Sequence, residues 1–487
     1  MKPSITKATF LGAQECLTRA WMQLRAAPSP LSPAEELRVL EGTALGELAR
    51  ESFPGGVLVQ ERGTEAAVRR TQALLEDSTV EVIFEGAFVH GSYVTRPDIL
   101  IRERDGWKVI EVKSSLHDEG KADKGHLQDL AYTTMVLQLA GIATSSTELM
   151  RLSRDWTGDA TAPFRRYECT AQVKELVQRF LSEAPEVSEL LRSDRMPAAE
   201  LTLACRRCDL FGAGCLGDNL AHPVLEIPRL SEATLKRLKA AGIHDIKDIP
   251  SDFHLTENQR LVVEYIQGGA LSVDSPSLTS LLSNVEWPCY YLDFESAKSA
   301  IPLFEGTRPH QQILTQYSLH VCADLICEPK HTEYLAPHTH DARRELAERL
   351  LADLGDRGTI VVYSGYEATQ VKALAVLFPD LSDRLMSLRA RFFDLEEVFK
   401  GAVVHPEFRG STSIKVTLPA IVPDMNYEGL GIGNGEAAIV AFVKMVRGVS
   451  APEEIKLARR DLLAYCKQDT LGMVMLHRAV AALLPRS

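Results

Sequence analysis

The chain has 487 residues, of which 45% are hydrophobic and 25% charged, a composition typical of a soluble globular protein with more than one domain. Its formal net charge of −12 means that the surface as a whole repels nucleic acid, so any nucleic-acid binding must come from local basic grooves. No stretch approaches eighteen uninterrupted apolar residues, and residues 1–7 lack the apolar core of a signal peptide. We therefore expect a cytoplasmic protein with no membrane partner.

The first half begins with helices. Residues 4–50 read as mainly helical, with a break at residues 28–33 and a helix start at Ser32-Pro33, where acids follow a capping residue and a proline. Residues 80–89 are apolar and β-branched and predict a strand that leads toward Asp98.

Two further strands are predicted at residues 98–101 and 107–113, with a tight turn between them. This hairpin brings Asp98 close to Glu111 and Lys113, and the last two share a strand face because they are two residues apart. Phosphodiester hydrolysis builds negative charge on oxygens, so it needs a hard cation such as Mg²⁺ or Mn²⁺, held by carboxylates, and usually a further positive group. Taken alone, the acids also fit a strand cap and a surface ion pair. A helix over residues 126–139 follows.

Eight of the nine cysteines fall into two groups, and Cys16 stands apart in the N-terminal segment. Five are scattered and fit small buried hydrophobic side chains, namely Cys169, Cys289, Cys322, Cys327 and Cys466. Cys205, Cys208 and Cys215 lie within eleven residues, a spacing that predicts ligation of one ion or cluster. The fourth ligand would be His222 or a distant residue, and we favour Cys16.

Residues 222–284 change to short helices separated by prolines. Residues 230–250 predict a helix, a turn at Gly242 and a second helix start. Such segments can hold a nucleic-acid backbone through main-chain N–H groups, but they serve at least as often as connectors.

The last two hundred residues have a clear order of elements. Strands are predicted at residues 290–294, 313–321, 331–335 and 359–363, and helices at residues 342–354 and 367–377. Three strands followed by alternating helix and strand are typical of the start of a ribonuclease-H-like α/β fold.

A second acidic group is predicted in this half. It comprises Asp293 and Glu295 on one side of a strand, Glu367 after the fourth strand, and Tyr465 and Asp469 on one face of a helix. Four converging carboxylates repel one another unless cations neutralise them, which predicts two divalent metal ions, with the tyrosine orienting the attacking water. Asp394 competes with Glu367 as the third acid.

Residues 1 to about 220 resemble the RecB-type PD-(D/E)XK nucleases, and among them the CRISPR-adaptation exonucleases, in which one early and three late cysteines hold an iron-sulfur cluster. The matching residues are Asp98, Glu111, Lys113, Gln128, Tyr132, Cys16, Cys205, Cys208 and Cys215. The resemblance implies a nuclease with catalytic Gln128 and Tyr132 and a [4Fe-4S] cluster, with Zn²⁺ as the alternative. One departure is Gly46, which stands where those families place a metal-binding histidine. The site would then hold one metal, be completed by Glu47 or Glu85, or be weakened.

Residues 286–487 resemble an uncharacterised bacterial domain family, domain of unknown function 2779, related to the DEDD exonucleases that cut from 3′ ends. Asp293, Glu295, Tyr465 and Asp469 match the tyrosine-containing subgroup, and Glu367 stands where that pattern has Asp. The longer reach of Glu367 alters the geometry available to a second metal.

We therefore expect an α/β protein with a PD-(D/E)XK restriction-endonuclease-like domain over residues 1–221 and a ribonuclease-H-like domain over residues 286–487. A small helical connector, similar to a helix-hairpin-helix, would join them over residues 222–285. The expected function is a metal-dependent exonuclease with two sites, with DNA favoured over RNA as the substrate. The alternative is a catalytically impaired nucleic-acid-binding scaffold in DNA repair or phage defence.

Overall fold

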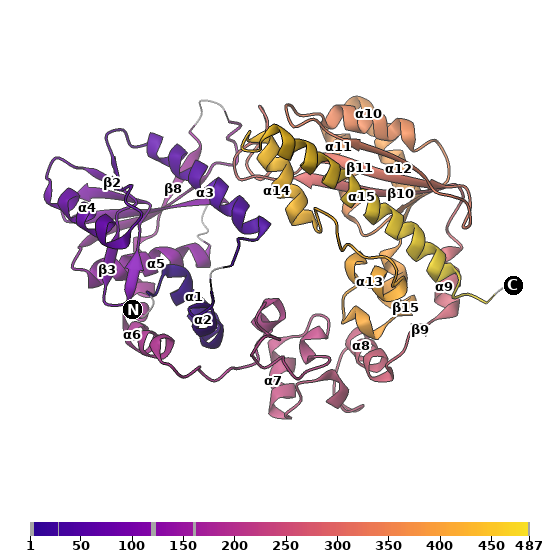
Figure 1. Cartoon of the computed structure of the whole chain (residues 1–487), viewed down its shortest axis with the longest axis horizontal. Coiled ribbons are helices and arrows are strands. Elements are labelled where there is room, and N and C mark those ends of the chain that lie inside the picture. Colours follow the sequence, from indigo (N-terminus) through magenta and orange to yellow (C-terminus); the bar gives the residue numbers. More distant parts are fainter. Residues whose placement is uncertain (1–3, 28, 118–122, 159–161, 486–487) are drawn as a thin grey trace. The chain divides into compact units, whose positions relative to one another are not determined.

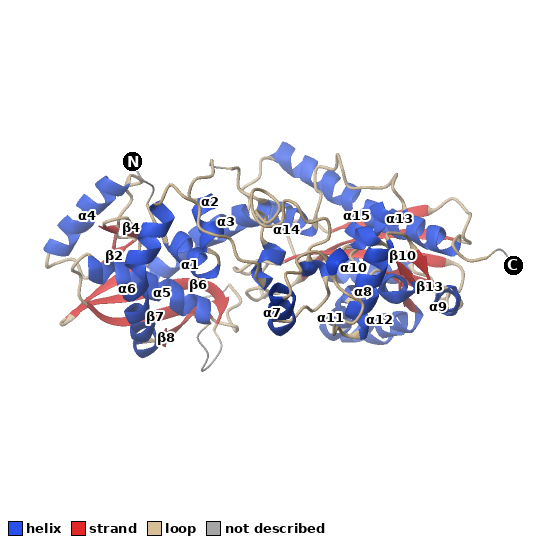
Figure 2. Cartoon of the chain, turned by 90° about the horizontal axis from the view of Figure 1, so that it is seen from below, coloured by secondary structure: helices blue, strands red, loops and turns tan. Residues whose placement is uncertain are grey.

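The computed structural model describes residues 4–27, 29–117, 123–158 and 162–485, which form a mixed α/β protein (Figures 1 and 2). The chain divides into two compact units: unit 1 is Met1–Glu200 with Ser299–Gln311, and unit 2 is Leu201–Lys298 with Gln312–Ser487. Among the described helices, none has the length and apolar character needed to cross a membrane.

The elements of unit 1 in chain order are α1 (Lys7–Glu15), α2 (Leu17–Gln23), α3 (Pro33–Glu51), β1 (Val57–Leu58), α4 (Thr64–Glu76), β2 (Val82–Phe84), β3 (Phe88–His90), β4 (Tyr93–Thr95), β5 (Ile99–Glu103), β6 (Gly106–Leu116), α5 (Lys124–Leu139), β7 (Thr144–Leu152), β8 (Phe164–Glu168) and α6 (Thr170–Arg192). Six strands form one sheet in the order β1-β2-β5-β6-β7-β8, and β3 pairs with β4 separately. The predicted hairpin is confirmed, because β5 and β6 pair antiparallel from Glu103↔Gly106 to Ile99↔Ile110. The β6–β7 pair next to it is parallel.

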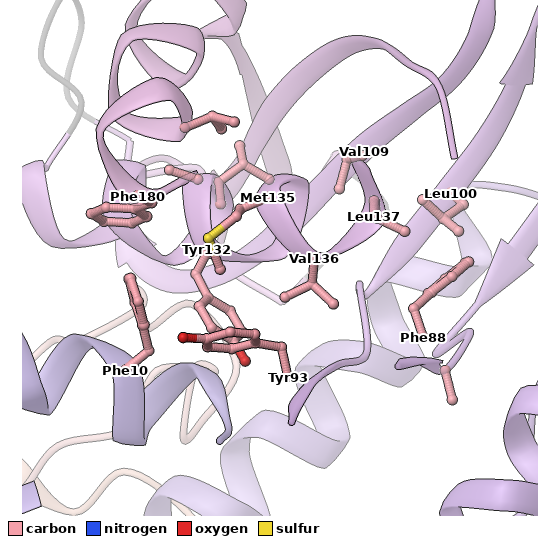
Figure 3. Close-up of a cluster of buried hydrophobic side chains, with 14 of the residues drawn as sticks. Phe10, Phe88, Tyr93, Leu100, Val109, Tyr132, Met135, Val136, Leu137 and Phe180 are labelled. Atoms are coloured by element: carbon pink, nitrogen blue, oxygen red, sulfur yellow. The ribbon is translucent and has the colours of Figure 1, made fainter. Parts of the chain in front are cut away.

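Alternation along the strands gives this sheet two buried faces. Leu100, Val109 and Leu149 belong to the core that includes residues of α1, α5 and α6, whereas their neighbours Ile110 and Met150 belong to the core that includes residues of α3. Figure 3 shows the first core, where Phe10, Tyr132 and Phe180 meet. The β6 strand, which carries Glu111 and Lys113, is therefore fixed by packing on both faces.

The helix predictions for unit 1 are confirmed, with a further break at Cys16 between α1 and α2, whereas one strand prediction is wrong. Ser32 and Glu35 form a reciprocal capping box at the start of α3, as the sequence indicates. The single strand predicted over residues 80–89 is wrong, because Glu85 adopts a φ of 56° and divides it into β2 and β3. This left-handed residue turns the chain beside Asp98.

The α-helices and strands of unit 2 are α7 (Glu232–Ala240), α8 (Glu257–Gly268), β9 (Ser272–Val273), α9 (Ser275–Leu282), β10 (Cys289–Ala297), β11 (Ile313–Cys322), β12 (Lys330–Leu335), α10 (Arg343–Asp353), β13 (Thr359–Val362), α11 (Tyr366–Leu377), α12 (Ser382–Leu388), β14 (Phe392–Asp394), β15 (Val403–Val404), α13 (Ile414–Ile421), α14 (Gly435–Val446) and α15 (Pro452–Ala481). Its main sheet has the order β12-β11-β10-β13-β14, antiparallel from β12 to β10 and parallel from β10 to β14. All four predicted strands and both predicted helices of this half are present.

Helix α15 lies along β10 and β11 (Figure 1). Alternate residues of β11 face it: the Gln316 side chain donates to the Leu462 carbonyl (3.0 Å), and the hydroxyls of Ser318 and Thr470 are 2.8 Å apart. Tyr317, between them, points the other way and donates to Asp353 of α10 (2.6 Å). These buried contacts fix the rotation of α15 about its axis. They therefore decide which residues of α15 lie next to the acidic residues of β10.

The unit boundaries differ from the three predicted domains. The helical segment that includes α7 and α8 has its own small core, but that core also contains Val404, so the segment belongs to unit 2. Residues 299–311 belong to unit 1, where the Ala300 N–H donates to Glu41 (2.8 Å) and His310 contacts the Ser114 carbonyl (2.6 Å). Sequence order did not reveal this excursion because the segment has no periodic pattern.

Candidate functional site

The second half of β10 and the middle of α15 carry a group of acidic residues in unit 2. One carboxylate oxygen from each of Asp293, Glu295 and Asp469 lies within 4.8 Å of the other two. Asp293 and Glu295 share a strand face, and a bulge follows directly between Glu295 and Ser296. Among the described residues, this is the one group of three or more His, Cys, Asp or Glu side chains that meets the distance. Oxygen donors of this kind suit Mg²⁺ or Mn²⁺.

Glu367 adds a fourth carboxyl, from the first turn of α11. It is 2% exposed, and its Oε2 atom has no hydrogen-bond partner among the described residues. Burial and then the charge of Asp394 raise the pKa of Glu367 to about 8, and the charges of Glu295 and Asp469 add to this. A buried oxygen without a partner is costly unless a proton or a cation satisfies it.

The pKa values of the other acids are raised for the same reasons. Burial and the charge of Asp469 raise the pKa of Glu295 to about 8, and burial raises that of Asp469 to about 6. The pKa of Asp293 is well above its ordinary range because of burial and the charges of Asp469 and Glu295. Without a cation, the group therefore holds protons at neutral pH.

Asp394, the competing acid, has a different environment. Its Oδ1 accepts the backbone N–H groups of Ser364 (2.8 Å) and Glu396 (3.0 Å), so it shapes the turn after β14. Burial raises its pKa. The charge of Asp394 contributes to the raised pKa of Glu367, so the two carboxyls are close to each other.

Replacing Glu367 with Gln is expected to change how stability depends on pH. In the folded protein Glu367 keeps its proton to about pH 8, whereas its ordinary pKa is 4.5, so folding takes up a proton between these values. The free energy of unfolding must therefore fall as pH rises through this window. In EDTA, Glu367→Gln should melt close to the parent at pH 5 and clearly above it at pH 8. The exposed Glu328→Gln is the control, and an equal difference at both pH values would contradict the expectation.

Two tyrosines and one lysine lie near these acids. The sequence predicted Tyr465 but not Tyr427 or Lys415. Tyr465 lies on α15, as predicted, and is buried, and the centre of the Tyr427 ring is 6.2 Å from the centre of its ring. The Tyr427 hydroxyl donates to Asp469 at 2.5 Å, and Lys415 Nζ lies over both rings. Burial and the charge of Asp469 raise the pKa of both phenols, so they remain neutral donors. Tyr427 follows α13 in an irregular stretch that offers no periodic signal.

In unit 1, the hairpin brings Asp98 and Glu111 together. Asp98 precedes the Ile99↔Ile110 pair on one side and Glu111 follows it on the other, and Asp98 Oδ2 accepts the N–H of Val112 at 2.6 Å. Burial and the charge of Glu111 raise the pKa of Asp98. The predicted pair of acids is therefore a real neighbour pair.

Two ammonium groups already surround Glu111, which is 2% exposed. Its Oε1 pairs with Lys113 (3.0 Å) and with Lys7 of α1, while its Oε2 is buried without a partner among the described residues. Burial raises the pKa of Glu111, but the charges of Lys113 and Lys7 outweigh this and lower it overall. Lys113 also pairs with Asp129 of α5, and these acids raise its pKa against the opposite effect of burial. Sequence reasoning missed Lys7 and Asp129, which lie on helices without a distinctive motif.

Gly46 lines a cavity of about 150 Å³ together with Glu85 and Asp98. A Cβ atom built at Gly46 would meet only Arg50 Nη1, at 3.4 Å, so the position has room for a side chain directed at the acids. Glu85 lines the same cavity, and burial raises its pKa. Glu47 is exposed and does not line this cavity. Of the two residues expected to replace the missing histidine, Glu85 is the one in position.

Gln128 and Tyr132 do not share an environment. Tyr132 is fully buried, and its hydroxyl lies 2.7 Å from the carbonyl of Ile5 and 3.0 Å from that of Val94. Gln128 is partly exposed and lines a different space, of about 740 Å³, with Asp129. Four residues along a helix give the same general face, but the neighbouring strands decide that Tyr132 lies in the core.

The predicted cluster cysteines lie in both units, Cys16 in unit 1 and the other three in unit 2. Cys16 caps α2, where its Sγ accepts the N–H of Arg19 at 3.4 Å. Cys205 and Cys208 line one cavity of about 800 Å³. Among the described residues, the thiols of Cys205, Cys208 and Cys215 do not lie within 4.8 Å of one another, as the oxygens of the acidic group do.

The comparisons with known proteins match parts of the chain. Residues 290–413 match the model of a domain of unknown function, DUF2779, in agreement with the resemblance seen in the sequence. That region contains Asp293, Glu295 and Glu367 and ends before Asp469.

Two similar curated proteins are themselves uncharacterized. UU173 of Ureaplasma parvum is 23% identical over 225 residues, or 40% of this chain and 31% of that protein. MG366 of Mycoplasma genitalium is 23% identical over 209 residues, or 38% of this chain and 30% of that protein. The matched segment thus spans less than a third of each relative.

Two solved structures are similar to parts of the chain. An alkaline exonuclease from Laribacter hongkongensis is 13% identical, covers 39% of this chain and 92% of its own, and gives a TM-score of 0.22. A structure of a protein named SSO0001 is 17% identical, covers 42% of this chain and 96% of its own, and gives a TM-score of 0.17. Likenesses at these TM-scores assign no activity to this chain.

Proposed function

We propose that the chain is a metal-dependent nuclease whose principal site is the acidic group of unit 2. The observation that carries this proposal is the convergence of Asp293, Glu295 and Asp469 within 4.8 Å, beside the unpartnered buried oxygen of Glu367. Ordinary surface acids avoid such convergence, because each raises the cost of ionising the others. The order of the main sheet, antiparallel and then parallel, is consistent with a ribonuclease-H-like domain related to the DEDD exonucleases.

Asp293, Glu295, Glu367 and Asp469 would hold Mg²⁺ or Mn²⁺. A bound divalent cation there would neutralise charge on the phosphate and on the attacking and leaving oxygens. The chain's own groups would position the reactants, with Tyr465 and Tyr427 donating hydrogen bonds from neutral phenols. In the overall step a water oxygen bonds to phosphorus, the bond from phosphorus to a sugar oxygen breaks, and that oxygen receives a proton while the water loses one. DNA is the substrate we favour.

For unit 1 we propose a PD-(D/E)XK-type site with reduced or no cleavage, acting mainly in binding nucleic acid. Asp98 and Glu111 would hold one cation, with Glu85 as a further candidate ligand. Two observations favour impairment: Gly46 offers no ligand, and Lys7 and Lys113 already neutralise Glu111. The same two ammonium groups suit a phosphate ligand.

A cleavage assay tests both assignments. The full-length protein is incubated with end-labelled single- and double-stranded DNA and RNA in Mg²⁺ or Mn²⁺, next to Asp98→Asn and Asp293→Asn. We expect Asp293→Asn to abolish most cleavage and Asp98→Asn to remove little. Equal cleavage by Asp293→Asn and the parent on every substrate would overturn the principal site, and a large loss in Asp98→Asn would overturn the impairment of unit 1.

We also propose that Cys205, Cys208 and Cys215 are ligands of a [4Fe-4S] cluster, with Zn²⁺ as the alternative. The support is the cysteine spacing and the common cavity wall formed by Cys205 and Cys208. Protein purified without oxygen should be brown and contain about four irons per chain, whereas Cys208→Ser should lose the iron. Stoichiometric zinc without iron would favour the alternative. A protein that contains neither iron nor zinc would exclude both proposals.

A further inference from the structure

Lys415 is an exposed cation beside the acidic group of unit 2. It lies in the first turn of α13, and its Nζ atom is 5.2 Å from the ring centre of Tyr465 and 5.8 Å from that of Tyr427. Within the described part of the chain it forms no ion pair, unlike Lys113 of unit 1, which pairs with two acids. The two rings thus lie next to the ammonium group of Lys415.

The charge of Lys415 acts on the carboxylates. It lowers the pKa of Glu295 and Asp469, against burial, which is the largest effect on both and raises them. Because no carboxylate of the described residues forms an ion pair with the Lys415 ammonium group, its electric field is available to a ligand that enters the site. A ligand attracted to both a carboxylate-bound cation and an ammonium group must itself be anionic.

The chain around Lys415 is anchored to the same site. Tyr427, twelve residues further on, donates to Asp469 at 2.5 Å, and the Gln468 side chain donates to the Asn426 carbonyl at 2.9 Å. At the other end, the Tyr363 hydroxyl lies 2.7 Å from both the Thr412 carbonyl and Thr417 Oγ1. Lys415 is therefore held on a segment that contacts Asp469 and Gln468 of α15 on one side and Tyr363, directly after β13, on the other.

We propose that Lys415 is a catalytic residue of this site, whose ammonium group binds a non-bridging oxygen of the scissile phosphate. The inference rests on the proposed nuclease function and deepens it. Lys415 offsets the charge that grows on the phosphate oxygens as water attacks, and it transfers no proton. It also offers the anionic substrate an attractive group at the entrance to an otherwise acidic site.

The test compares Lys415→Met and Lys415→Arg in a full-length chain that already carries Asp98→Asn, so that unit 1 contributes nothing. Single-turnover cleavage is measured at saturating labelled oligonucleotide, and Mn²⁺ affinity is measured by calorimetry without substrate. We expect Lys415→Met to cleave about 100-fold more slowly, with Mn²⁺ affinity equal or tighter because a nearby positive charge is gone. Lys415→Arg should stay within about ten-fold of the parent. The exposed Lys372→Met of α11 is the matched control and should leave the rate unchanged.

The possible results distinguish a failure of the Lys415 proposal from a failure of the proposed nuclease function. A Lys415→Met rate within about three-fold of the parent, with Asp293→Asn inactive, overturns the role of Lys415 alone. A slow Lys415→Met variant that also loses Mn²⁺ affinity points to structural damage and likewise overturns the phosphate contact. Undiminished cleavage by Asp293→Asn overturns the nuclease site itself.

Discussion

Asp293→Asn and Asp469→Asn should each lower metal-dependent cleavage by about a thousand-fold or more, the largest effect we expect for this protein. Each removes one of the three carboxylates whose oxygens converge within 4.8 Å. An amide keeps the shape of the side chain but supplies no negative charge, so cation affinity falls together with the rate. Calorimetry with Mn²⁺ should show weaker binding in both variants.

The same substitutions are expected to raise the stability of the metal-free protein. Burial holds the pKa of both aspartates above the ordinary range, and the charge of Asp469 raises that of Asp293 further, so at pH 8 their ionised forms oppose folding. Melting in EDTA at pH 8 should therefore occur at a higher temperature in each variant than in the parent. Asp383→Asn, at an exposed position of α12, is the control. Loss of cleavage together with loss of stability would mean that these acids support the fold rather than bind a cation.

Tyr132→Ala should destabilise unit 1 by about 3–5 kcal/mol, because it removes a fully buried aromatic side chain. The Tyr132 ring packs 5.4 Å from Phe10 and 6.4 Å from Tyr93, in the core shown in Figure 3. Tyr132→Phe keeps this packing and loses only the contact of the hydroxyl with the Ile5 and Val94 carbonyls, so about 1 kcal/mol is expected. Urea denaturation followed by circular dichroism measures both changes.

The two substitutions also decide between a core role and the catalytic role that the family resemblance implies for Tyr132. The comparison is made in a chain that also carries Asp293→Asn, so that the remaining cleavage comes from unit 1. If Tyr132 belongs to the core, adding Tyr132→Phe should leave this remaining cleavage unchanged, after a small correction for stability. A Tyr132→Phe protein that melts normally but cleaves much more slowly would restore the catalytic role. Gln128→Ala serves as the companion variant, because Gln128 is partly exposed and can change without opening the core.

The acidic pairs could be foreseen because they depend on local geometry. Asp293 and Glu295 share a face by strand alternation, and the β5–β6 hairpin sets Asp98 next to Glu111 through a tight turn that its own residues specify. Both regularities act within a few residues, so a pattern of side chains suffices to predict them. The predicted strand at residues 80–89 failed for a local reason that no pattern showed, the left-handed backbone of Glu85.

The amino-acid sequence by itself determined the mixed α/β class and the positions of the strands along the second half of the chain. It also determined which carboxylates of one strand point to the same side. Only the tertiary structure brought Lys7 to Glu111, Tyr427 to Asp469 and Lys415 to the aromatic pair beside the acids, and only it placed Tyr132 in the core. Local periodicity fixes the direction of a side chain relative to its own helix or strand. Which groups meet across elements depends on how helices and sheets pack, and that packing is set by the sum of many buried contacts rather than by any short motif.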